Sequence, residues 1–96
     1  MNLENIFYKT IDEFNHSQNE YEIEKDDSFL IIGDGSALDS LAIVNFFTRL
    51  EKNYLKILKK EIDIINNIFS LNKEKITLKE LLILLKNDFK EWNHYS

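Results

Sequence analysis

The sequence predicts an all-α domain, a small four-helix bundle with a long first loop and a short third helix. The chain of 96 residues has no proline, and its two glycines, Gly33 and Gly35, are too few for the turns of a β-rich domain. Apolar residues recur every three or four positions along most of the chain, which gives a helix one apolar face. Hydrophobic residues make up 44% of the chain, enough for one core, so we expect a single domain over residues 1–96.

The first helix is expected over residues 3–16. Its apolar stripe is formed by Leu3, Ile6, Phe7, Ile11 and Phe14. A polar, acidic stretch over residues 17–27 follows and is predicted to be a solvated loop. The apolar run Phe29–Ile32 has no hairpin partner nearby, so we expect it to lie across the core as part of this loop rather than as a strand.

The second helix is expected over residues 39–54. At 100° per residue, one sector about 160° wide forms the predicted core face and holds Ile43, Val44, Phe46, Phe47, Leu50 and Tyr54. Leu41 falls outside that sector, beside Asn45, Thr48 and Lys52, and is therefore expected to be exposed.

The C-terminal part is predicted to hold a short third helix over residues 64–71 and a last helix over residues 77–92. The charged residues 55–63 before them are expected to form a loop or an extension of the second helix. The third helix is predicted to close over the core with Ile64, Ile65, Ile68 and Phe69. Thr77 and Glu80 match a capping box, in which each side chain accepts a hydrogen bond from the other's backbone N–H. The last apolar stripe consists of Leu78, Leu81, Leu82, Leu85, Phe89 and Trp92, widened by Ile83 and Leu84.

Composition argues against several classes of partner and compartment. The net charge is −5, from 17 acidic and 12 basic side chains, and nucleic-acid binding requires clustered Lys and Arg instead. There is no cysteine, so neither a disulfide nor a thiolate metal site can form. No apolar run approaches the roughly 18 residues that membrane insertion needs, and the N-terminal residues do not match a signal peptide. We expect a cytoplasmic monomer.

The segment Leu38-Asp39-Ser40-Leu41 lies where a glycine-containing loop meets the second predicted helix. The first residues of a helix leave backbone N–H groups unpaired and carry partial positive charge. A serine at this junction keeps its hydroxyl outside the helical ladder, facing solvent beside an anion-friendly terminus. The position therefore suits a serine that carries a phosphate-linked group.

With Gly33–Phe47 and Leu50-Glu51 around it, this motif resembles that of acyl carrier proteins, and the resemblance extends over residues 3–90. In that family the serine of Asp-Ser-Leu carries 4′-phosphopantetheine, whose thiol holds acyl groups as thioesters. The resemblance implies an acyl-carrier type of bundle and a phosphoprotein without catalytic residues. It makes Ser40 the attachment site of the covalent cofactor, with Asp39 and Leu41 beside it. We expect no bound metal, because with Gly35 as the sixth position of a calcium loop Leu30 would stand at the first, where an oxygen ligand is required.

The same resemblance implies a set of partner enzymes. A phosphopantetheinyl transferase would use coenzyme A and Mg²⁺ to modify Ser40, and acyl-loading and acyl-transferring enzymes would follow. The expected partner-facing residues are Leu41, Asn45, Thr48, Glu51 and Lys52. Many carriers have an acidic second helix, whereas this face holds Ala42, Arg49 and Lys52, with Glu51 as its main carboxylate. We therefore expect a carrier for a specialised pathway of lipid or secondary-metabolite biosynthesis rather than general fatty-acid synthesis.

Three alternatives are open at this point. An aminoacyl or peptidyl carrier protein has the same fold and serine, and differs in its loading enzyme. An unmodified helical interaction module would pair through the apolar excess of residues 82–92. An independent enzyme is disfavoured, because neither Ser36 nor Ser40 lies in a Gly-x-Ser-x-Gly elbow and the histidines, His16 and His94, lie at predicted helix ends.

Overall fold

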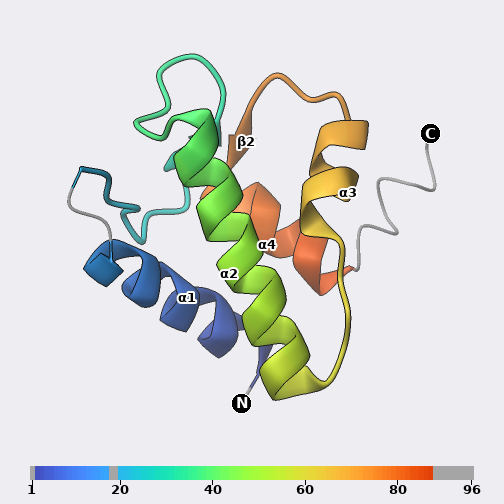
Figure 1. Ribbon diagram of the computed structural model, residues 1–96. Coiled ribbons are helices and arrows are strands. Elements are labelled where there is room, and N and C mark those ends of the chain that lie inside the picture. Colours follow the sequence, from blue (N-terminus) through green and yellow to red (C-terminus); the bar gives the residue numbers. More distant parts are fainter. Residues whose placement is uncertain (1, 18–19, 88–96) are drawn as a thin grey trace.

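The computed structural model describes residues 2–17 and 20–87, which fold into four helices and two short strands (Figure 1). In chain order these are α1 (Leu3–Ser17), β1 (Leu30–Ile32), α2 (Ser40–Leu58), α3 (Ile64–Ser70), β2 (Ile76–Thr77) and α4 (Leu78–Lys86). Figure 1 shows α2 running the length of the molecule, with α1 on one side and α3 on the other, while α4 lies behind it. The predicted small helical fold with a long first loop and a short third helix is thereby confirmed.

The core is centred on Phe46, near the middle of α2. Its ring meets Phe7 and Phe14 of α1 edge to face, with centroid distances of 6.2 and 5.7 Å. The side chains of Leu50 on α2 and Leu81 on α4 are also completely buried. Burying this apolar surface is the main favourable contribution to folding, and it draws α1, α2 and α4 together.

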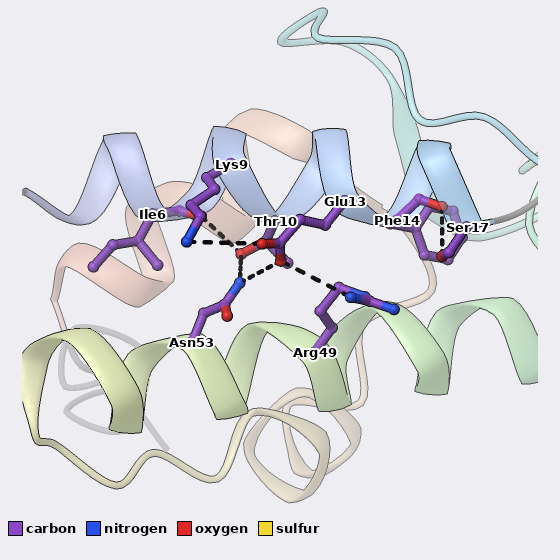
Figure 2. Close-up of polar contacts among 8 residues, drawn as sticks. All are labelled: Ile6, Lys9, Thr10, Glu13, Phe14, Ser17, Arg49 and Asn53. Carbon is purple, nitrogen blue, oxygen red and sulfur yellow. Dashed lines mark hydrogen bonds and ion pairs between the residues drawn. The ribbon is translucent and has the colours of Figure 1, made fainter.

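A small polar cluster lies between α1 and α2 (Figure 2). The Thr10 hydroxyl donates a hydrogen bond to the Ile6 carbonyl at 2.7 Å. The Asn53 amide donates to both Thr10 Oγ1 and Glu13 Oε1, each at 2.9 Å. Thr10 and Asn53 are buried, so these bonds replace the water that the side chains lose on folding. The cluster fixes one relative position of the two helices, which a purely apolar interface would specify less sharply.

The prediction that Phe29–Ile32 forms a loop is wrong in part, because Leu30–Ile32 forms strand β1. It pairs in antiparallel fashion with β2, with Leu30 opposite Thr77 and Ile32 opposite Ile76. Local pattern could not show this partner, since it lies more than forty residues further along the chain. Ile31 is completely buried, so the segment does contribute to the core as expected.

The faces of α2 differ from the prediction at two positions. Val44, expected in the core, is 37% exposed, whereas Ala42, expected on the outer face, is buried. The helix also continues to Leu58, four residues beyond its predicted end, and Lys59 closes it in the left-handed conformation at φ 56°. Residues 55–63 are thus a helical extension first and a loop afterwards.

Helix α3 starts at its predicted residue, Ile64, and α4 starts at Leu78, one residue after its predicted start, but not every predicted core residue is buried. In α3, Ile64 and Ile68 are buried while Phe69 is 60% exposed. In α4, Leu84 is buried and Leu82 only partly so. The capping box of Thr77 and Glu80 is confirmed, with Glu80 N–H donating to Thr77 Oγ1 at 3.2 Å. The predicted continuation through Phe89 and Trp92 lies outside the described residues.

Within the described ranges, no helix combines the length and the hydrophobicity that crossing a bilayer requires.

Gly33 and Gly35 should differ in their tolerance of a side chain. Both have positive φ, 131° and 93°, but a Cβ on Gly33 would lie 2.8 Å from Lys75 Cγ, whereas a Cβ on Gly35 would meet open space. We expect Gly35→Ala to lower the free energy of unfolding by about 1 kcal/mol, from backbone strain alone. Gly33→Ala should cost about 2–4 kcal/mol, because a steric clash is added. Urea unfolding measures both, and equal losses would contradict the prediction.

The α4 capping box should make stability depend on pH. Lys73 donates to the Glu80 carboxylate, which lowers the pKa of that group below its ordinary value of 4.5, and the Thr77 N–H adds to the effect. A depressed pKa gives stability that is present above the unfolded value and lost as pH falls through the folded value. Glu80→Gln keeps the cap but not the charge, so it should cost about 0.5 kcal/mol at neutral pH. Urea midpoints of both proteins should converge at acidic pH, and a constant difference would refute this account.

Candidate functional site

Ser40 is the first residue of α2, as the sequence predicts. Asp39 precedes it as the N-cap, in extended conformation, and its Oδ1 accepts a hydrogen bond from Ala42 N–H at 2.8 Å. The Asp39 carbonyl accepts the first helical bond, from Ile43 N–H at 3.0 Å. The Ser40 side chain is exposed, and among the described residues it makes no hydrogen bond or ion pair. Within the described residues, the Ser40 hydroxyl therefore does not stabilise the fold.

Burial on both sides turns the motif outward. Leu38 is only 6% exposed and Ala42 only 2%, so both are anchored in the core. The three residues between them have to bridge these anchors on the outside, and Asp39, Ser40 and Leu41 are all exposed. Leu41 is 69% exposed, a high value for a leucine, which confirms its predicted exposure.

The loop before the motif is held by Ser36. Its hydroxyl donates to the Ile31 carbonyl of β1 at 2.9 Å and accepts from Leu38 N–H at 3.1 Å. A turn stabilised by the hydrogen bond from Ser36 N–H to the Gly33 carbonyl, 3.0 Å long, precedes it. The short sheet therefore fixes the place where the chain enters α2, and with it the position of Ser40.

The electrostatics of the site are dominated by Asp39. The hydrogen bond from Ala42 N–H, followed by one from the Tyr21 hydroxyl, lowers the pKa of Asp39. The Tyr21 oxygen lies 2.8 Å from Asp39 Oδ2, and this bond raises the pKa of Tyr21. Asp39 is therefore an anion at neutral pH and already takes up donors of the helix terminus.

The predicted partner-facing residues occupy different environments. Leu41, Asn45 and Lys52 are exposed, and Thr48 is half-buried. Glu51, by contrast, turns toward α3, where its Oε2 accepts from Ile64 N–H at 2.7 Å and from Ile65 N–H at 3.3 Å. Glu51 thus serves as an acceptor for the unpaired amides at the start of α3, a use that helix periodicity could not reveal.

An open groove brings three of these residues together. It has a volume of about 710 Å³ and runs between the second half of α2 and the loop to α3, lined by Thr48, Glu51, Lys52, Leu55, Glu61, Ile62 and Asp63. Asn45 lines a second hollow between α1 and α2, with Thr48 and Lys52 again at its edge. The groove begins eight residues after Ser40, about 12 Å along the helix axis.

Sequence reasoning missed two features of the site. Tyr21 is eighteen residues from Asp39, and no local pattern marks it as a neighbour. Val44 lies one helical turn after Leu41 and is exposed with it, and Phe69 on α3 adds a third exposed apolar side chain. Periodicity placed Val44 and Phe69 inside because it cannot tell which part of an apolar sector a neighbouring helix covers.

Searches against protein-family models, curated proteins and solved structures find no match to this chain.

Removing each side chain of the motif should separate its structural from its chemical part. Asp39→Ala removes the N-cap acceptor and should lower the urea midpoint, while Asp39→Asn, an equally good cap, should restore most of it. Ser40→Ala should leave the midpoint unchanged, since the hydroxyl is exposed and unpaired in the described structure. A large loss of stability in Ser40→Ala would show that the hydroxyl has a structural role.

Proposed function

We propose that this chain is an acyl carrier protein that holds its cargo on a 4′-phosphopantetheine arm attached to Ser40. The observation that carries the proposal is the exposed hydroxyl of Ser40 at the first residue of α2, which has no hydrogen-bond partner among residues 2–17 and 20–87. Its neighbours Leu38 and Ala42 are buried and hold the hydroxyl at a corner of the molecule that another enzyme can reach. The four helices of the described residues, with a long first loop and a short third helix, support a bundle of the acyl-carrier type.

The chain's own contribution to this chemistry is a single oxygen in a fixed place. Ser40 Oγ gives up its proton and attacks the phosphorus of coenzyme A that bears the pantetheine arm, in a reaction that the transferase catalyses. The diphosphate bond breaks, adenosine 3′,5′-bisphosphate leaves, and a phosphodiester joins Ser40 to the arm. The hydroxyl fits that role because it is solvated and because a phosphodiester there stays in water, at no desolvation cost. Once attached, the arm supplies the thiol on which acyl groups are held as thioesters. Asp39 keeps the helix start in place beside it.

The partner enzymes would bind the outer face of α2. Leu41 and Val44 offer them apolar contact, with Asn45 and Lys52 as polar neighbours. Glu51 is withdrawn from this set, because its carboxylate holds the start of α3. The exposed face of α2 therefore has fewer carboxylates than that of general carriers. This difference supports a role in a dedicated lipid or secondary-metabolite pathway. An aminoacyl or peptidyl cargo is compatible with the same geometry.

A second candidate is an unmodified helical interaction module. It is favoured by the exposure of two large apolar side chains, Leu41 at 69% and Phe69 at 60%, because contact with a partner would remove them from water. These two side chains lie on α2 and α3, whereas the surface first expected for such a module, residues 82–92, is largely outside the described chain.

Intact-mass analysis decides between the two. Incubation with a broad-specificity phosphopantetheinyl transferase, coenzyme A and Mg²⁺ should add the mass of one phosphopantetheine group to the wild-type protein. Ser40→Ala should gain nothing, and Ser28→Ala, a loop serine bonded to Asp26, should be modified like the wild type. An unmodified wild type, under conditions that modify a housekeeping carrier, would favour the interaction module. Loading assays with fatty acids and amino acids then separate the two kinds of carrier.

A further inference from the structure

Tyr21 fastens the first loop to the residue beside Ser40. It lies in the long loop between α1 and α2, and its hydroxyl donates to Asp39 Oδ2 at 2.8 Å. The other carboxylate oxygen, Oδ1, accepts from Ala42 N–H at the same distance. One donor thus comes from the loop and the other from the helix. Each oxygen of the Asp39 carboxylate is therefore held by its own hydrogen bond. Its orientation next to Ser40 depends on a residue far away in the sequence.

The loop around Tyr21 is already ordered by a second anchor. Ile23 is buried, and its N–H and carbonyl bond the side chain of Asn15 at 2.8 and 2.9 Å. Lys25 adds an ion pair with Asp12 of α1, 2.7 Å long. Because these contacts fix the loop against α1, the Tyr21 hydroxyl reaches Asp39 without ordering a free segment, and little entropy opposes the bond.

We propose that Tyr21 is a positioning residue for the modification of Ser40: it holds Asp39 and the first loop in the arrangement that the modifying enzyme recognises. This inference rests on the proposed carrier function and adds a specific determinant to it. The hydroxyl of Tyr21 acts through Asp39 rather than on the reacting atoms. Its loss should therefore weaken recognition of the carrier and leave the chemical step unchanged, that is, raise KM at constant kcat.

The opposing pKa changes of the two residues agree with this geometry. Hydrogen bonding to Asp39 raises the pKa of Tyr21, because the bond favours the protonated phenol. The same bond is the second cause, after Ala42 N–H, that keeps the pKa of Asp39 low. Removing the phenol hydroxyl should therefore raise the pKa of Asp39, a change that NMR can follow at its carboxyl carbon without any modifying enzyme.

The test compares Tyr21→Phe with a matched control, Tyr8→Phe. Tyr8 lies on α1 with its ring against Phe7, and its hydroxyl makes no hydrogen bond within the described structure. The wild type and both variants are titrated with the transferase, coenzyme A and Mg²⁺, and kcat and KM for the carrier are measured by intact mass. For Tyr21→Phe we expect KM to rise about threefold to tenfold, the range that one hydrogen bond spans, with kcat unchanged. Tyr8→Phe should behave like the wild type.

A double-mutant cycle shows whether the effect passes through Asp39. In an Asp39→Ala background the acceptor of the Tyr21 hydroxyl is gone, so adding Tyr21→Phe should change KM by less than twofold. An undiminished effect in that background would overturn the inference, as would equal KM values for wild type and Tyr21→Phe. An unchanged Asp39 pKa in Tyr21→Phe would do the same. A wild type that the transferase cannot modify at all would overturn the carrier proposal itself, and this inference with it.

Discussion

Two buried residues four positions apart determine most of what is distinctive in this molecule. Leu38 and Ala42 are both anchored in the core, and the chain changes between them from loop to helix. A helix presents residues on all sides, but here the first turn has one inward position, Ala42, and the preceding loop has another. The intervening residues cannot reach the core, so their side chains face water. The accessibility of Ser40 is therefore a consequence of packing rather than of local flexibility.

Several other contacts serve this arrangement. The β1–β2 pair ties the end of the first loop to the segment before α4, and Ser36 connects β1 to Leu38. Phe46, one turn further along α2, locks that helix to α1 through two edge-to-face aromatic contacts. The polar cluster of Thr10 and Asn53 holds the opposite half of α2 in register with α1. The start of α2 is thus fixed from the loop, from the core and along the helix.

The parts of the fold that could be predicted are those encoded by neighbours in sequence. Apolar spacing gave the four helices, and Thr77 with Glu80 gave the start of α4, because capping involves residues three positions apart. The β1–β2 pair could not be foreseen, since Leu30 and Thr77 are distant in the chain. The end of α2 was misplaced because Lys59 adopts the left-handed conformation without the glycine or asparagine that usually signals it.

For the candidate site, the sequence predicted the Asp39-Ser40-Leu41 motif but not the residues that surround it in space. The exposure of Leu41 follows from helix geometry, but Tyr21 reaches Asp39 only through the path of the loop. Val44 and Ala42 exchanged their expected places, because the apolar sector of α2 is wider than the surface its neighbours cover. The packing of the other helices determines which edge of such a sector is buried. The sequence of one helix does not contain that information.

Glu51 links two parts of the molecule mechanically. Its side chain leaves α2 toward α3, where a single oxygen, Oε2, accepts hydrogen bonds from the backbone amides of Ile64 and Ile65. A cation that bound this carboxylate would compete with both amides for that one oxygen. If the carboxylate moved away, the two amides would lose their acceptor, and the contact between α2 and the start of α3 would weaken. The start of α3 therefore depends on the charge and the placement of a single side chain of α2.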